Sequence, residues 1–162
     1  MTRSAHDDLK LWIPGVPAPQ GSKRAFRHRG RVVLVESSRK LPAWRHLVTS
    51  VAAARCPQPI AGAVAVQLVF VMPRTKAMRN RPAPPMTQRP DLDKLTRAAL
   101  DGLTGPVLVD DSHVVELHVV KRRARPDEPT GMRVTVRPVE ALEPPTLRQC
   151  AGEGQTSARD PE

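Results

Sequence analysis

Apolar residues along the 162-residue chain form five short runs with the alternating or β-branched character of strands. The run 61–72 is β-branched and almost unbroken, which is typical of a central strand covered on both faces. Three of the other runs alternate apolar and polar residues, as expected of strands with one buried face, and the run 31–36 reads as a short strand. These runs are 9–13, which ends at Pro14-Gly15, together with 31–36, 113–122 and 132–139.

Two further segments carry apolar residues at three- and four-residue steps, which predicts amphipathic helices. The first follows Ser38, a suitable N-cap, has Pro42 in its first turn and extends to Arg55. The second spans 91–103 and ends before Gly105-Pro106. The predicted buried positions are Trp44, Leu47, Val48, Val51 and Ala54 in the first helix, and Leu92, Leu95, Ala99 and Leu103 in the second. Two helices among five strands predict an α+β domain with a small mixed sheet.

Segments rich in proline and glycine separate these elements and predict loops. Residues 17–30 form a basic loop bounded by Pro and Gly. Residues 73–90 combine five basic residues with five prolines, so we expect a mobile basic loop there. From about residue 141 the composition is that of a disordered tail, and the expected folded domain covers residues 1–140.

The chain is strongly basic, with a formal net charge of +10, but its charges are unevenly placed. Residues 1–90 contain 16 basic and 3 acidic side chains, whereas residues 91–117 contain 2 basic and 6 acidic ones. An acidic centre inside a basic body is typical of a protein that attracts a polyanion and keeps carboxylates for a cation. Two Trp, two Phe and no Tyr argue against modules that bind RNA or single-stranded DNA through rows of aromatic side chains.

Several other classes of protein are disfavoured by what the sequence lacks. Two cysteines are too few for a disulfide framework, which favours the reducing cytoplasm. The longest apolar run is too short for a bilayer span, and Asp7 and Asp8 stand where a signal peptide needs apolar residues, so we expect no membrane partner. No Walker-type or Rossmann-type glycine pattern occurs, so we expect no nucleotide cofactor.

Four aspartates are the candidate metal ligands. Asp91 and Asp93 lie at the start of the second helix, and Asp110 and Asp111 lie in a turn just before the strand 113–122. If the helix packs beside that strand, these carboxylates come close and repel one another, which favours a hard cation such as Mg²⁺, or Mn²⁺ in its place. The alternative is structural, because aspartate is also common at helix N-caps and in turns.

Lys94 and Arg97 lie on the same predicted helix and have two interpretations. Their spacing allows exposed ion pairs with Asp91, Asp93 and Asp101, each worth about 0.2–0.5 kcal/mol. They are equally suited to lie beside a metal-bound phosphate and stabilise its negative charge. The spacing alone leaves both interpretations open.

The segment Arg89-Pro-Asp-Leu-Asp-Lys-Leu-Thr-Arg97, followed by Asp110-Asp111-Ser-His-Val-Val and by Val120-Lys121, resembles the core signature of the RusA family of Holliday-junction resolvases. The segment 13–24 is also similar to the family's N-terminal strand and loop. The resemblance covers residues 9–138 in element order and implies a RusA-like fold. Because the family is common in phages and prophages, it also implies the cytoplasm of a bacterial or phage-infected cell.

Carried over by position, the resemblance implies that Asp91, Asp93 and Asp111 bind Mg²⁺, with Asp110 as their neighbour. It further implies a homodimer whose two sites cut opposed strands of a four-way DNA junction. The chain departs from the family pattern at Lys94, where many relatives have Asn, and at Arg97, where the best-studied type has Lys. Arginine can hold phosphate charge but does not give up its proton, so an electrostatic role survives at that position and an acid role is in doubt.

We therefore expect a structure-selective DNA endonuclease that resolves Holliday junctions by Mg²⁺-dependent phosphodiester hydrolysis in recombination and repair. Asp91, Asp93 and Asp111 hold the metal, while Lys94 and Arg97 stabilise the charge of the phosphate. Basic residues are expected to hold the arms of the branched DNA through phosphates; they are Lys23, Arg24, Arg27, Arg74, Lys76, Arg79, Arg81, Arg89 and Lys121. The alternatives are a non-catalytic basic DNA-binding protein and a related nuclease that acts on forks or flaps.

Overall fold

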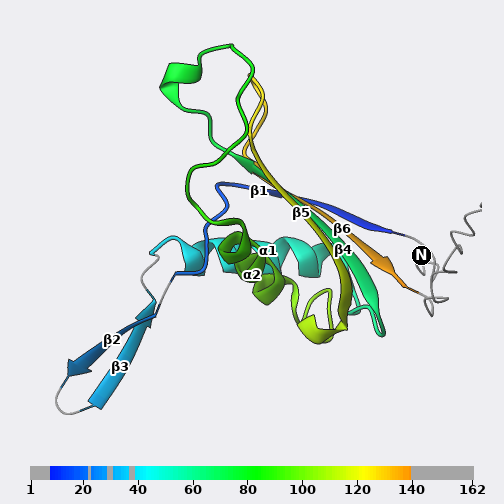
Figure 1. Cartoon of the computed structure of the whole chain (residues 1–162). Coiled ribbons are helices and arrows are strands. Elements are labelled where there is room, and N and C mark those ends of the chain that lie inside the picture. The colour runs from blue at the N-terminus through cyan, green and yellow to red at the C-terminus, as the bar shows by residue number, and fades with distance from the viewer. Residues whose placement is uncertain (1–7, 22, 29–30, 37–38, 140–162) are drawn as a thin grey trace, which may run out of the picture.

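A computed structural model describes residues 8–21, 23–28, 31–36 and 39–139. Two helices cover one face of a four-stranded mixed sheet, and a two-stranded hairpin extends away from this body (Figure 1). The strand order is β1-β6-β4-β5, in which only β4 and β5 run parallel. The strands are β1 Leu9–Pro14, β4 Val64–Met72, β5 Val114–Arg123 and β6 Gly131–Pro138. The predicted α+β fold with a mixed sheet is confirmed.

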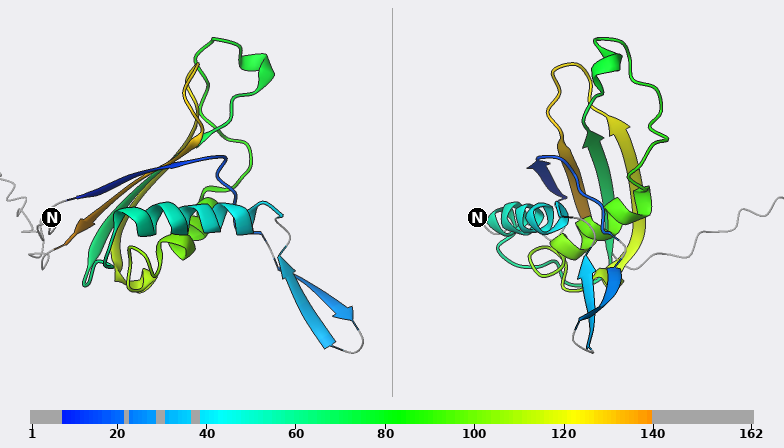
Figure 2. Two further views of the ribbon diagram at one scale, coloured as in Figure 1. Left: turned by 180° about the vertical axis from the view of Figure 1, so that it is seen from behind. Right: turned by 90° about the vertical axis from the view of Figure 1, so that its left-hand side faces the viewer.

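The helices α1 (Leu41–Arg55) and α2 (Leu92–Leu103) lie on the same face of the sheet (Figure 2). Their apolar stripes and the alternate positions of the strands form one core, as the sequence periodicity predicts. The two helices approach closely at Gly102, where a Cβ atom would lie 2.8 Å from Cγ1 of Val48. One predicted core position is wrong, because Ala54 is exposed and Ala52 is buried in its place.

The sheet face turned away from the helices is covered only in part, which corrects the expectation for 61–72. The strand begins at Val64, and its positions facing the helices are buried as predicted. On the other face Ala65 and Val71 are buried, but Gln67 is exposed and Val69 is half-buried. We call this face, with the matching positions of β1, β5 and β6, the open face of the sheet.

The basic segment 17–30 is not wholly a loop, because it contains a strand. Strand β2 (Lys23–His28) pairs antiparallel with β3 (Arg31–Glu36), so that Lys23 lies opposite Glu36. The valine-rich β3, which the sequence predicts correctly, supplies the hydrogen-bonding partner that a basic strand needs. The side chains of Lys23, Arg24 and Arg27 lie outside the described residues, so their assigned roles stay predictions.

The predicted N-cap at Ser38, itself outside the described residues, is wrong, because α1 begins at Leu41 with Lys40 in the N-cap position. Pro42 lies in the first turn, as predicted. The predicted tail 141–162 also lies outside the described residues, and the domain limit at residue 140 stays a prediction.

Neither α1 nor α2, nor any shorter helix in the described ranges, has the length and apolar character needed to cross a membrane.

An ion pair joins the end of β5 to the turn before β6. Both Nη atoms of Arg122 donate to the Glu128 carboxylate at 2.6 Å, and the backbone N–H of Arg125 donates to it at 2.8 Å. The hydrogen bonds from Arg122 are the main reason why the pKa of Glu128 falls from 4.5 to about 2. The pair therefore stabilises the folded chain above pH 4.5, and this contribution is lost as the pH falls towards 2.

The substitution Glu128→Gln should lower the free energy of unfolding at pH 7 by about 1.5–3 kcal/mol, because it removes a charge-assisted pair. The difference from the parent protein should vanish near pH 2, as urea unfolding over this pH range would show. Glu116→Gln is the control, since Glu116 and Arg137 are 3.5 Å apart and more than half exposed. Glu116→Gln should lower the free energy of unfolding by less than about 1 kcal/mol. A Glu128→Gln effect that does not change with pH would contradict the assignment.

Candidate active site

Helix α2 determines where the candidate catalytic side chains point. Its buried stripe, which includes Leu95, Ala99 and Leu103, packs into the core. Asp93 and Arg97 are one turn apart on the exposed side of the helix. The position of this side is therefore set by the apolar periodicity of α2.

Asp93 and Asp111 come from separate segments and line one open groove, which we call the α2–β5 groove. The groove has a volume of about 440 Å³, and its other lining residues include Arg97 and Asp101. Leu117 and Val119 of β5 form part of its apolar wall. The structure thus brings together one aspartate from each of the two acidic motifs.

Arg97 is not used in the ion pairs that its spacing allows. Asp101 pairs instead with Arg45, whose Nη2 lies 2.8 Å from the Asp101 Oδ2. Within the described ranges no salt bridge involves Arg97, Asp93 or Asp111. The guanidinium and the two carboxylates of the groove are therefore exposed to a ligand rather than engaged with one another.

Asp91 faces a different hollow, which we call the loop groove. Its volume is about 770 Å³, and it lies between the loop after β1 and the start of α2. Asp91 is the N-cap residue of α2, but its carboxylate pairs with Lys94, with 3.4 Å between Oδ2 and Nζ. Lys40 and Arg89 also line this groove, so three cations surround one acid.

Asp110 has a structural role in the described arrangement. Its side chain accepts a hydrogen bond of 2.9 Å from the backbone N–H of Ser112 and caps the 3-10 helix η2 (Asp111–His113). Hydrogen bonds from Ser112 are the main cause of a lowered pKa of Asp110. The turn interpretation therefore applies to Asp110, while its neighbour Asp111 lines the α2–β5 groove.

The residues of the α2–β5 groove fit a hard divalent cation by their chemistry. Magnesium is often held by one or two carboxylates, with water and substrate phosphates completing the coordination, and Asp93 and Asp111 are two such oxygen donors. Across residues 8–21, 23–28, 31–36 and 39–139, no three His, Cys, Asp or Glu side chains are grouped closely enough to share an ion. The convergence of Asp91 with this pair, which the resemblance implies, stays a prediction.

The basic loop 73–90 is irregular apart from the short 3-10 helix η1 (Lys76–Met78), and several of its hydrogen bonds are internal. The guanidinium of Arg74 donates to the backbone oxygens of Arg79, Arg81 and Ala124 at 2.6–2.8 Å. In this arrangement Arg74 holds the loop together. Lys76, Arg79, Arg81 and Arg89 are exposed and suited to contact phosphates.

Lys121 ties the end of this loop to β5. Its Nζ donates to the backbone oxygens of Gln88 and Pro90, at 3.0 and 2.8 Å. Pro90 directly precedes Asp91, so this lysine holds the chain just before the aspartates of α2. Sequence reasoning assigned Lys121 to DNA and missed this contact, because only the fold brings β5 beside residue 90.

Sequence reasoning also missed Gln20 and Lys40, both of which line the loop groove. The backbone N–H of Gln20 donates to the Lys94 oxygen at 2.9 Å, which attaches the loop after β1 to α2. The buried Oε1 of Gln20 has no hydrogen-bond partner among the described residues. For Gln20 the only signal was the Pro-rich segment 13–24, which resembles the family's N-terminal loop, and Lys40 had no such signal.

Comparison with known proteins identifies the family of the chain. The family model for the endodeoxyribonuclease RusA matches residues 14–137, which include both grooves and most of the chain. No curated protein gives a significant match. The chain belongs to the RusA endodeoxyribonuclease family.

Proposed function

We propose that this protein is a Mg²⁺-dependent endonuclease that resolves Holliday junctions in DNA recombination and repair. One observation carries the proposal: Asp93 and Asp111, from two separate segments, line one groove together with Arg97. An ion bound there, Mg²⁺ or Mn²⁺, would supply Lewis acidity to the scissile phosphate and lower the pKa of a bound water. Asp91 is proposed as a third ligand that turns away from Lys94 when DNA and metal are present.

The cations of the two grooves have separate tasks in this proposal. Arg97 stabilises the negative charge that develops on the phosphate in the α2–β5 groove. Lys94, with Lys40 and Arg89, holds a neighbouring phosphate in the loop groove. Both tasks are electrostatic, which suits an arginine that does not release its proton.

We also propose that the protein acts as a homodimer in the cytoplasm. Paired cuts in a four-way junction need two sites, which a twofold-symmetric dimer supplies. Strand β5 is at the edge of the sheet and exposes Val115 and Val120, which supports association through this edge. Light scattering of the purified protein would report the oligomeric state directly.

A panel of labelled DNA substrates tests the proposed function. We expect the protein to cut a four-way junction symmetrically in Mg²⁺, to cut forks, flaps and duplex DNA much more slowly, and to stop in EDTA. Faster cleavage of forks or flaps would assign it to the related substrate class. Binding without cutting of any substrate in Mg²⁺ or Mn²⁺ would instead favour the non-catalytic DNA-binding protein.

Lys121 is expected to act as a positioning residue. Lys121→Met keeps the aliphatic chain but removes the donors to Gln88 and Pro90. We expect kcat to fall about tenfold, because the segment that carries Asp91 is no longer held in place. Amide hydrogen exchange in residues 88–95 should become faster, as measured by mass spectrometry.

Lys121→Arg is the matched variant, since it keeps a donor and should recover part of the rate. The KM and the salt dependence of binding should change little in either variant. A loss of DNA affinity with a salt slope reduced by about 1 and an unchanged kcat would show that Lys121 contacts a phosphate instead.

A further inference from the structure

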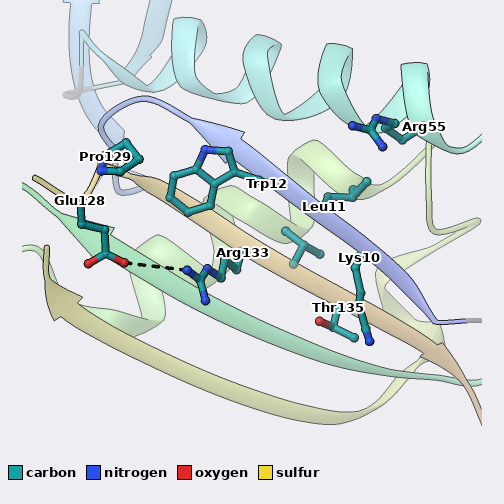
Figure 3. Close-up of a pocket in the computed structure, with 9 residues that line it drawn as sticks. Lys10, Leu11, Trp12, Arg55, Glu128, Pro129, Arg133 and Thr135 are labelled. Carbon is teal, nitrogen blue, oxygen red and sulfur yellow. Dashed lines mark ion pairs between the residues drawn. The ribbon is translucent and has the colours of Figure 1, made fainter. Parts of the chain in front are cut away.

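A basic hollow with one aromatic wall lies on the side of the sheet formed by β1 and β6 (Figure 3). Its volume is about 600 Å³. Lys10 and Trp12 reach it from β1, Arg133 and Thr135 from β6, and Arg55 from the end of α1. We call it the β1–β6 hollow.

Strand alternation separates this hollow from the α2–β5 groove. Lys10 and Trp12 alternate with Leu9, Leu11 and Ile13, which are buried beneath the helices, so the first two belong to the open face. Leu117 and Val119 of the α2–β5 groove belong to the helix-covered face, because they pair with core positions of β4. The hollow also extends around the edge strand β1, where Leu11, Val134 and Arg55 of α1 line it. The part formed by Lys10, Trp12 and Arg133 lies on the face of the sheet opposite to the α2–β5 groove.

The charge of the β1–β6 hollow favours a polyanion. Lys10, Arg55 and Arg133 are exposed, and the Arg133 side chain retains 64% of its accessible surface. Glu128 is the one acid among the described lining residues, and Arg122 neutralises it through two hydrogen bonds of 2.6 Å. The Arg133–Glu128 separation of 3.9 Å makes that second pair weak.

Trp12 adds an aromatic surface to these cations. Its ring lies directly against Gly131, where a Cβ atom would be 2.5 Å from Cζ2 of the indole. A side chain at position 131 would therefore displace the ring, and glycine allows it to lie close to the strand. Trp12 stays half-buried and lines the hollow, whereas Trp44, the other tryptophan of the chain, belongs to the core. Cations around an aromatic ring are the usual means of holding nucleic acid strands without sequence preference.

We infer that the β1–β6 hollow is a second DNA-binding surface, which holds one strand of an unpaired or unstacked segment. Lys10, Arg55 and Arg133 contact its phosphates, and a base stacks on Trp12. A contact on this side of the sheet raises the affinity for DNA without taking part in cleavage. The inference requires DNA as the ligand, which family membership supports, and does not depend on junction resolution.

The test uses the full-length protein in EDTA, so that binding is measured without cleavage. Addition of an oligothymidylate should quench the fluorescence of Trp12, while the core residue Trp44 contributes a constant signal. The double variant Lys10→Ala/Arg133→Ala should bind this probe about 5–10-fold more weakly, with a log–log salt slope smaller by about 1–2. Its kcat on saturating DNA substrate in Mg²⁺ should equal that of the parent.

Arg137→Ala is the matched control, because Arg137 is exposed on the open face but lines a different hollow and pairs with Glu116. It should change the affinity less than twofold. Trp12→Phe should retain binding and Trp12→Leu should lose it, with circular dichroism confirming that each is folded. If Trp12→Leu does not fold, the charge variants decide the question.

An unchanged affinity and salt slope in the double variant would overturn the inference. The inference would also be overturned if the double variant, without DNA, had a different molar mass from the parent protein. That result would show that a second copy of the chain occupies the hollow. If the parent protein cuts no DNA at all, the proposed function fails. The binding experiment in EDTA still decides whether the β1–β6 hollow binds DNA.

Discussion

Asp93→Asn is expected to reduce the rate of DNA cleavage in Mg²⁺ by at least about 10²-fold, and Asp111→Asn should do the same. Each substitution replaces one of the two carboxylates that line the α2–β5 groove with a neutral amide, which holds Mg²⁺ less strongly. DNA binding should be retained or slightly strengthened, because one negative charge near a phosphate is removed. Single-turnover cleavage and fluorescence anisotropy measure the two effects separately.

Asp127→Asn is the control for this pair. Asp127 lies in the turn between β5 and β6 with φ of 60°, a conformation that asparagine tolerates as well as aspartate does. The rate of DNA cleavage by Asp127→Asn should stay within about twofold of the rate of the parent protein. Normal cleavage by Asp93→Asn would refute the role assigned to the α2–β5 groove. Asp93 would then have only a structural role, as an acidic side chain in the first turn of α2.

The second large effect is expected at Arg97. Arg97→Ala should lower kcat about 10- to 100-fold, because the groove loses the guanidinium proposed to stabilise charge on the phosphate. Arg97→Lys should recover part of the rate, since it restores a positive charge without the planar fork. Cleavage measured at saturating DNA separates this loss from weaker binding.

The alternative for Arg97 is that it is only an exposed cation on the surface of α2. In that case Arg97→Ala would cost no more than about 0.5 kcal/mol of stability and would leave kcat unchanged. The exposed residue Arg125, on the turn after β5, serves as the control for a general loss of positive charge. A similar loss of kcat in Arg125→Ala and Arg97→Ala would contradict a specific role for Arg97.

Much of the fold follows from local patterns. The three- and four-residue spacing of Leu95, Ala99 and Leu103 predicts α2, and the structure ends this helix just before Gly105, as expected. The alternation in β1 and β6 likewise predicts which of their residues are buried. These predictions succeed because burial of one face imposes a period on the sequence.

The errors have a common physical origin in contacts between distant segments. Lys23–His28 is a strand because β3 pairs with it, and no local feature of its basic sequence indicates that partner. The strand Val64–Met72 has apolar residues on both faces, but only one of these faces is covered by helices. Composition reports the hydrophobicity of a strand and not which elements pack against it.

Within the candidate site, the sequence singled out individual residues more readily than their partners. It singled out Asp93, Asp111 and Arg97, which the fold places in one groove. It left open whether Arg97 is used in an ion pair, and the answer depended on Arg45, a residue of α1 that takes Asp101 instead. It also did not predict that Asp91 faces a groove of its own with Lys94.

The sequence by itself determined the order of the elements other than β2, the faces of the helices and the aspartates from which a metal site could be built, because each of these depends on residue type and short spacing. Only the tertiary structure decided which of those aspartates share a groove, which cations are engaged by backbone oxygens, and that Lys10, Trp12 and Arg133 surround a second hollow. These outcomes depend on strand register and on helix packing between segments tens of residues apart, which local spacing does not encode.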